Sequence, residues 1–254
     1  MSVLNRLWFV PAVLVVWEAL TRLKADTDFP PPTAIAGRMR ELWFSGPAAR
    51  LFLTDEAVAN LLPSLARMFT GWLLAAAAGV LAGVLIGRSR AAQDYAGPLI
   101  QFGRSVPPPL LLPFFLALLQ GGLATQLAGI VFGVIWPVLL NSIDGARSVE
   151  VLQIETARVF GLSRAEQVRR VIIPAAAPKI LAGLRLSLSL ALIMMVISEL
   201  FGGTDGIGYQ LLQAQRGFDT PGVWAAIALL GLLGYVVNSL FVVIERRLLG
   251  WQGA

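Results

Sequence analysis

The chain has 254 residues, of which 57% are hydrophobic and 14% are charged, whereas a typical soluble domain has about 25% charged residues. This composition and a mean hydropathy of +0.74 indicate a lipid environment. The net charge is +5, but the basic residues stand in loops beside apolar runs, a pattern of membrane topology that disfavours nucleic-acid binding. Cysteine and histidine are absent from the sequence, which excludes disulfides, Cys/His zinc sites, thiol nucleophiles and Ser-His-Asp catalysis.

Six apolar segments are candidates for membrane-spanning helices, because a hydrocarbon core of about 30 Å needs roughly 20 helical residues. They cover residues 7–20, 63–87, 98–119, 123–143, 180–201 and 223–244. We interpret the first as a retained span and not as a cleaved signal peptide, since Trp17 and Glu18 interrupt its apolar run. Residues 1–60 then provide an N-terminal helix and an external amphipathic segment, and residues 61–254 provide a core of five helices.

The distribution of arginine and lysine predicts the orientation of these spans. Basic residues are concentrated in the loop 145–178, in the loop between the second and third spans and at the C-terminus. The loop after the third span has none, and the loop after the fifth has only Arg216. We therefore expect both termini and residues 145–178 on the cytoplasmic side of a bacterial inner membrane. Three arginines of the long first loop then lie outside, against the rule: Arg38, Arg40 and Arg50.

Small residues recur at every fourth position along the second span. Gly71, Ala75, Gly79, Gly83 and Gly87 therefore lie on one side of a helix. Small side chains at this spacing let a neighbouring helix approach closely and gain dispersion contacts in lipid. The stripe predicts helix packing and indicates nothing about a ligand.

The third span contains the sequence RSVPPPLLLP, residues 104–113. Pro107, Pro108 and the prolines that follow cannot all lie in an undisturbed helix, because each lacks an N–H group and clashes with the preceding turn. Irregular backbone at membrane depth is tolerated where it is buried in protein or faces a water-filled cavity. This segment is therefore a candidate for a translocation pathway, and a kink without contact to solute is an equal alternative.

The ionisable residues that stand out lie near the ends of the predicted spans. Arg104 and Arg185 lie near the cytoplasmic ends, and Glu18 and Glu199 near the outer ends, so a proton relay through the middle is disfavoured. Arg104, Arg185 and Glu199 are candidates for a pathway or gate; alternatively the arginines are interfacial anchors and Glu199 caps a helix or pairs with a cation. The sequence has no G-x-x-x-x-G-K-[ST] motif, so a process driven by ATP would need a partner that binds it.

Residues 148–174 form a charged stretch between the fourth and fifth spans. Four positions recur at helical spacing and predict one apolar face on a short helix: Val149, Leu152, Thr156, and Val159 or Phe160. Gly161 is expected to end this helix in the left-handed conformation. Ser163 is expected to N-cap the next segment, with Glu166 completing a capping box. The stretch is thus predicted to form a helix–glycine–helix elbow across the cytoplasmic face.

The elbow resembles the EAA signature of importer-type ABC permeases, commonly written E-A-A-x3-G-x9-I-x-L-P. The matching residues, in order, are Glu155, Thr156, Ala157, Gly161, Val171, Ile173 and Pro174. The spacing is kept throughout, and the departures at Thr156, Val171 and Ile173 replace residues of similar size. The resemblance implies a coupling helix that docks in a cleft of an ATPase subunit. Its implied docking residues are Glu155, Thr156, Ala157, Arg158, Phe160, Gly161, Leu162 and Ser163.

Other segments resemble the nitrate, sulfonate, taurine and bicarbonate-type permeases: FPPPTAI, SLARMFTGW, RSVPPPLLLP and ISELFGGTDGIGYQL. The loop LLQGGLATQLAG departs from that pattern, because it lacks the Trp-Phe-Gly text often seen there. The resemblance implies an all-α membrane protein with six helices in the type I ABC importer permease architecture. It further implies a homodimer that works with two ATPase subunits and a periplasmic or lipid-anchored solute-binding protein. ATP and Mg²⁺ are then expected to bind to the ATPase, and no cofactor is expected to bind to this chain. The resemblance thus implies a transport subunit that is not an enzyme and that imports a small anion by alternating access.

Three alternative classes make different predictions. A secondary carrier or channel, independent of ATP, predicts ionisable groups at depth or pairs of broken half-helices, and neither is evident. An intramembrane enzyme predicts His, Cys or paired Asp at depth, and the first two residue types are absent. A structural scaffold leaves the elbow unexplained.

Overall fold

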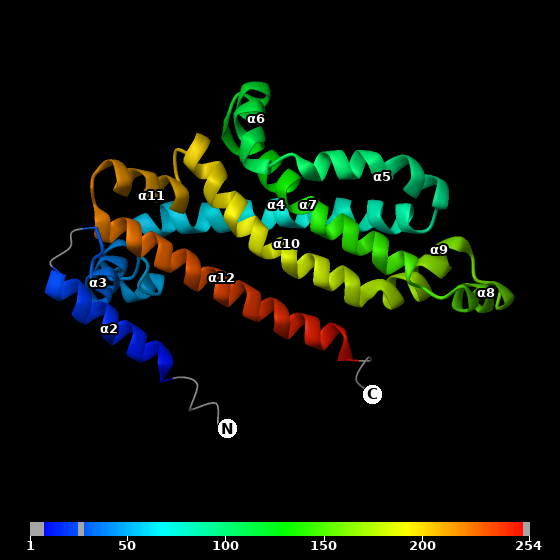
Figure 1. Ribbon diagram of the computed structural model, residues 1–254, viewed down its shortest axis with the longest axis horizontal. Coiled ribbons are helices and arrows are strands. Elements are labelled where there is room, and N and C mark those ends of the chain that lie inside the picture. The colour runs from blue at the N-terminus through cyan, green and yellow to red at the C-terminus, as the bar shows by residue number, and fades with distance from the viewer. Residues whose placement is uncertain (1–7, 25–27, 251–254) are drawn as a thin grey trace. The chain divides into compact units, whose positions relative to one another are not determined.

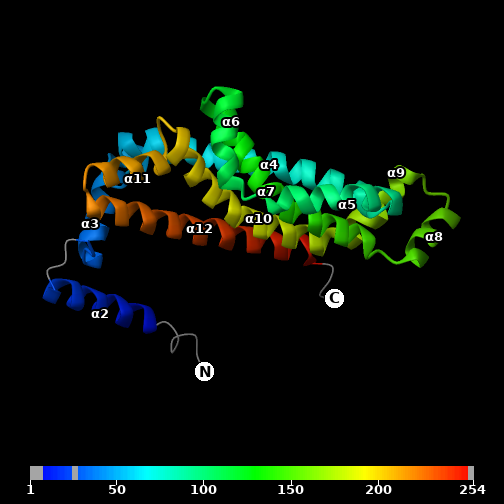
Figure 2. The same ribbon diagram turned by 45° about the horizontal axis from the view of Figure 1, so that its top comes forward.

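The computed structural model describes residues 8–24 and 28–250, and these residues form helices and no strands (Figures 1 and 2). The helices are α2 (Phe9–Lys24), α3 (Pro32–Trp43), η1 (Ala48–Arg50), α4 (Asp55–Gly87), α5 (Arg90–Ser105), η2 (Pro108–Leu111), α6 (Leu112–Leu119), α7 (Gly122–Arg147), α8 (Val151–Val159), α9 (Arg164–Gln167), the π-helical η3 (Val168–Ile172), α10 (Ile173–Gly202), α11 (Ile207–Arg216) and α12 (Thr220–Leu248). The chain divides into two compact units. One comprises Met1–Ser64 and Gly203–Leu233, and the other comprises Leu65–Gly202 and Gly234–Ala254.

Within the described residues, four helical stretches are long and apolar enough to cross a membrane. They are Ala48–Gly87, Gly122–Arg147, Arg164–Gly202 and Thr220–Leu248. A fifth span is counted if α5 and the η2–α6 segment, which meet at 85°, cross together. The predicted first span corresponds to α2, whose 16 residues fall short of the roughly 20 that a straight crossing needs; residue 7, where that span was predicted to begin, lies outside the described residues.

The third predicted span is two helices and not one. α5 begins already at Arg90 and ends at Ser105, and Val106 and Pro107 are extended, with ψ of 120° at both residues. The disturbed backbone expected at the prolines is confirmed, because the missing N–H groups and fixed φ of consecutive prolines cannot continue an α-helix. A Cβ built on Gly133 of α7 would lie 3.3 Å from Cβ of Pro108, so this irregular segment packs against protein.

The larger unit is built on close packing of α4, α7 and α10. α7 and α10 make an extensive contact and lie side by side in both views (Figures 1 and 2). The glycine stripe of α4 faces α7: a Cβ on Gly79 would come within 2.9 Å of Val138, and one on Gly87 within 2.6 Å of the carbonyl oxygen of Ile143. Side chains larger than hydrogen would push the two helices apart, so the close packing that the small residues at every fourth position predicted is present.

Gly83→Ala is expected to destabilise the protein by about 1–3 kcal/mol through overpacking. The added Cβ would lie 2.5 Å from Cβ of Ser142 and 2.8 Å from the carbonyl oxygen of Leu139. Gly97→Ala in α5 is the matched control, because nothing lies within 4 Å of its Cβ position and alanine favours a helix by up to about 1 kcal/mol. The check is the temperature at which each detergent-purified variant loses its monodisperse elution peak. Equal temperatures for the two variants would contradict the close contact.

Hydrogen bonds connect α3, the start of α4 and α11 in the smaller unit. Pro31 and Pro32 lead into α3, and Ile35 and Trp43 of this amphipathic helix are buried. Asn60 of α4 accepts a hydrogen bond from the backbone N–H of Gly206 at 2.8 Å, which ties the approach to α11 to α4. α3 is thus a short amphipathic helix within the segment expected after the first apolar run.

Candidate functional site

The elbow between α7 and α10 forms a hook at one end of the larger unit (Figure 1). α8 ends at Val159, and Gly161 follows with φ of +76°. The N–H of Gly161 donates to the carbonyl of Arg158 at 2.9 Å, and the N–H of Leu162 donates to that of Ala157 at 3.0 Å. These bonds satisfy carbonyls that the end of a helix leaves free, so the expected glycine C-terminus is confirmed.

A capping box starts the second arm of the elbow. The hydroxyl of Ser163 accepts from the N–H of Glu166 at 3.3 Å, and the Glu166 carboxylate accepts from the N–H of Ser163 at 3.0 Å. The buried Gln167 donates from its side chain to the carbonyl of Leu162 at 2.8 Å. Hydrogen bonds therefore stabilise the elbow on both sides of Gly161.

The predicted apolar face of α8 points outward, and a different face packs inward. Ile154 and Ala157 are buried, whereas Leu152 and Val159 of the predicted apolar face are exposed. Ile154 belongs to a cluster of buried side chains from several elements: Val84, Ala146, Val149, Ile154, Ile172, Ala176 and Ile180. This cluster is fixed by tertiary packing of α4, α7, η3 and α10, which a short helix's own apolar pattern does not reveal.

The outward face of α8 carries large apolar side chains. Phe160 is 78% exposed, Val159 86% and Leu152 69%. Glu155 lies on the same side, since residues three and four apart share a helix face, and it too is exposed. We call Leu152, Glu155, Val159 and Phe160 the coupling surface. Apolar side chains held outward on a rigid elbow are typical of a protein–protein contact.

The other implied docking residues take different positions. Ala157 is buried and contributes packing. Thr156 is exposed, and its hydroxyl donates to the carbonyl of Leu152 at 2.8 Å. Arg158, Gly161 and Ser163 are exposed, and Leu162 is half-buried.

The candidate pathway residues lie in separate environments. Arg104, in the last turn of α5, donates to Gln101 at 2.7 Å. Arg185 of α10 donates to Asn238 of α12 at 3.3 Å and pairs with Glu245 at 3.7 Å. Pro107 and Pro108 lie at the break between α5 and η2. Arg104 and Arg185 therefore contact different partners, on α5 and on α12.

Glu199 forms a buried ion pair. Its side chain is 0% exposed, that of Arg67 is 11% exposed, and Arg67 Nη1 lies 2.8 Å from Glu199 Oε1. The pair joins α4 to α10 within the larger unit. Sequence reasoning considered a nearby cation for Glu199 but did not identify Arg67, although an arginine inside an apolar span is itself a signal, because it needs a buried acceptor.

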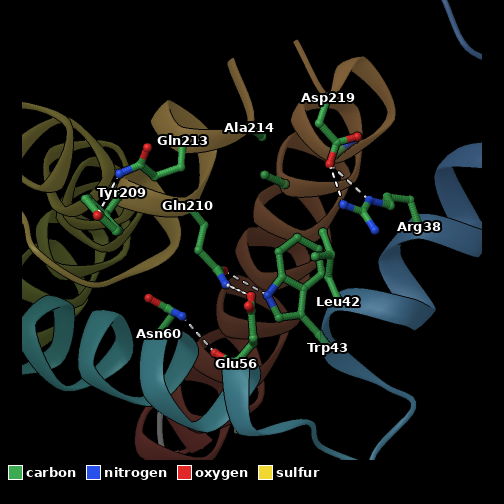
Figure 3. Close-up of a pocket in the computed structure, with 12 residues that line it drawn as sticks. Arg38, Leu42, Trp43, Glu56, Asn60, Tyr209, Gln210, Gln213, Ala214 and Asp219 are labelled. Atoms are coloured by element: carbon green, nitrogen blue, oxygen red, sulfur yellow. Dashed lines mark hydrogen bonds and ion pairs between the residues drawn. The ribbon is translucent and has the colours of Figure 1, made fainter. Parts of the chain in front are cut away.

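A second polar feature lies in the smaller unit, where a cavity of about 330 Å³ opens among α3, α4 and α11. Figure 3 shows Gln210 pointing between Trp43 and Glu56, with hydrogen bonds of 2.9 Å to each. Arg38 and Asp219 face each other at 2.6 Å, and this hydrogen bond raises the pKa of Arg38 above its ordinary value. The charged groups that line the cavity are therefore paired within the protein. Nor do the described residues include a group of three or more His, Cys, Asp or Glu that could hold a metal ion.

Residues 76–250 match the family of binding-protein-dependent transport system inner membrane components. The chain belongs to this family. The matched residues contain the elbow, the glycines of α4 from Gly79 onward and Glu199.

Two curated relatives and one solved structure resemble the permease over most of its length. It is 32% identical over 248 residues to SsuC of Bacillus subtilis (strain 168), named as an aliphatic sulfonates transport permease protein, covering 96% of this chain and 87% of that protein. It is 28% identical over 243 residues to the taurine transport system permease protein TauC of Escherichia coli (strain K12), covering 95% and 87%. A structure of the MetNI methionine ABC transporter in an inward-facing conformation superposes with a TM-score of 0.66 at 20% identity, covering 74% of this chain and 94% of that one. That likeness shows that the permease has the fold of an ABC importer permease.

Proposed function

We propose that the permease drives solute import by receiving mechanical force at its coupling surface from a separate ATPase. The observation that carries this proposal is the exposed apolar face of α8, held outward on a hydrogen-bonded elbow. Apolar side chains that stay exposed to water cost free energy, roughly 25 cal/mol for each Å² of apolar area. Burial of this surface in the cleft of a partner would offset that cost.

The inner face of α8 explains how force would reach the membrane. Ile154 packs in one cluster with Val84 of α4, Ala146 of α7 and Ala176 of α10. Closely packed interiors do not deform continuously, so a displaced α8 shifts the helices it contacts between discrete arrangements. Closure of the ATPases on ATP would thereby open the pathway outward, which is alternating access.

The complete importer has parts that this chain lacks. Two ATPase subunits bind ATP and Mg²⁺, a second copy of the permease completes the pathway, and a periplasmic or lipid-anchored solute-binding protein delivers the solute. Both termini and the elbow face the cytoplasm across the inner membrane, as the concentration of arginines around residues 145–178 supports.

The solute class that we propose is a small sulfonate. Both reported relatives are named for such solutes, aliphatic sulfonates and taurine. ATP-dependent uptake of radiolabelled taurine or ethanesulfonate into proteoliposomes that hold the permease, its ATPase and its binding protein is the test. We expect uptake of at least one of them above the level with non-hydrolysable ATP. Uptake of neither, with ATP hydrolysis intact, would contradict the sulfonate class and leave coupling in place; uptake without ATP would contradict the ATP-driven mechanism.

A further inference from the structure

A cavity of about 560 Å³ opens in the larger unit where α4 and α7 end and α5 and α8 begin. Its polar lining consists of Arg88, Arg90, Gln93, Asp94 and Arg147. Three guanidinium groups face one carboxylate, an excess of two positive charges. This cavity lies outside the coupling surface, and the import mechanism does not use it.

The three arginines of the cavity differ in their contacts to the rest of the protein. Arg88 donates to the backbone carbonyl of Ala146 at 3.3 Å, which orients it at the end of α7. Within the described residues, Arg90 and Arg147 have no ion pair, and both are exposed. A concave site with several unpaired guanidinium groups offers bidentate contacts to tetrahedral or planar oxyanions.

Two helix starts add to the positive potential. Arg90 is the first residue of α5 and Val151, which also lines the cavity, is the first of α8. The start of α5 is capped by Ser89, whose hydroxyl accepts from the N–H of Ala92 at 3.2 Å, whereas the Glu150 side chain makes no capping hydrogen bond to α8. Helix N-termini favour negative charge through the macrodipole.

We propose that this cavity binds an oxyanionic group, either the phosphate of an anionic phospholipid headgroup or a free oxyanion. Next to the cavity, α5 presents Tyr95, 82% exposed, and one turn later Leu99, 72% exposed. A tyrosine beside an apolar side chain is typical of the membrane–water interface, where headgroups lie. The cavity's place on the predicted cytoplasmic side puts it level with the inner-leaflet headgroups.

The test compares the full chain with two double variants of equal charge. Arg90→Gln with Arg147→Gln removes two cavity arginines, and Arg164→Gln with Arg169→Gln removes two exposed arginines that do not line the cavity. Native mass spectrometry measures retention of phosphatidylglycerol against phosphatidylethanolamine with the same acyl chains. Protection against thermal unfolding by inorganic phosphate measures binding of a free oxyanion.

We expect the cavity variant to bind the anion about a hundredfold more weakly than wild type, since each arginine whose charge-assisted hydrogen bonds are removed should cost about tenfold. The control variant should bind the anion within about twofold of wild type. Preference for phosphatidylglycerol that is missing only from the cavity variant identifies a headgroup site. Protection by phosphate that is missing from the same variant, without lipid preference in wild type, identifies a free oxyanion site. Equal weakening in both variants, or neither lipid preference nor phosphate protection in wild type, would overturn the proposal.

Discussion

Gly161→Pro is expected to abolish association with the ATPase while the helical bundle stays folded. Gly161 has φ of +76°, whereas proline fixes φ near −65° and has no N–H, so the bond to the carbonyl of Arg158 at 2.9 Å also disappears. The second arm of the elbow would leave its position relative to α8. The measurement is the ratio of ATPase to tagged permease after co-expression with the neighbouring genes and affinity purification.

Gly161→Ala distinguishes the effect of the left-handed backbone conformation from the effect of losing the N–H group, because alanine keeps that group. Nothing lies within 4 Å of the Cβ position of Gly161, so alanine meets no neighbour and only the left-handed backbone costs about 1–2 kcal/mol. We therefore expect an intermediate loss of ATPase for alanine and a complete loss for proline, with unchanged elution profiles for both permeases. A wild-type ATPase ratio in the proline variant would mean that the ATPase does not dock through the elbow.

Breaking the buried pair between Arg67 and Glu199 is expected to have the largest effect on stability. Removing one partner of a buried ion pair takes the opposite charge away from the other partner, which costs about 3–5 kcal/mol. At the sensitivity typical of chains of this size, Arg67→Ala should lower the melting temperature by on the order of 10 °C. The check is thermal unfolding of the detergent-purified permease.

Two variants serve as controls for this pair. Arg22→Ala removes a mostly exposed partner of Glu18, with an arginine side chain 65% exposed, and should cost less than about 1 kcal/mol. Arg67→Met combined with Glu199→Gln removes both charges together and should be less destabilising than Arg67→Ala. If the double variant were destabilised as much as the single variants Arg67→Met and Glu199→Gln combined, the two residues would not be acting as a pair.

Local sequence chemistry was sufficient for the features of this protein that a few neighbouring residues determine. The left-handed Gly161 and the capping box of Ser163 and Glu166 follow from the conformations and side chains of those residues. The packing of Gly83 against α7 follows from the absence of a side chain at a repeated helix position. Proline stereochemistry likewise indicated the interruption after Ser105.

Features that depend on distant residues could not be predicted in the same way. The buried face of α8 is chosen by a cluster from four other elements, so Ile154 points inward and Leu152 outward although both are apolar. The partner of Glu199 is 132 residues away, on α4. Proline stereochemistry predicts a break after Ser105 but not the angle of 85° between α5 and the segment that follows it. In the first two cases the deciding contacts join segments that the sequence does not place side by side.

Site-specific cross-linking from Phe160→Cys tests the central claim most directly. The chain has no cysteine of its own, so a thiol-reactive photo-cross-linker attaches to the permease at a single site. The experiment uses membranes that contain the co-expressed partners. Phe218→Cys is the matched control, because Phe218 is also highly exposed, at 91%, and lies in the loop that is predicted to face the opposite side of the membrane. We predict a cross-linked product from Phe160→Cys alone, whose second chain carries the ATP-binding G-x-x-x-x-G-K-[ST] motif. No such product, or an equal yield from both positions, would contradict coupling through α8.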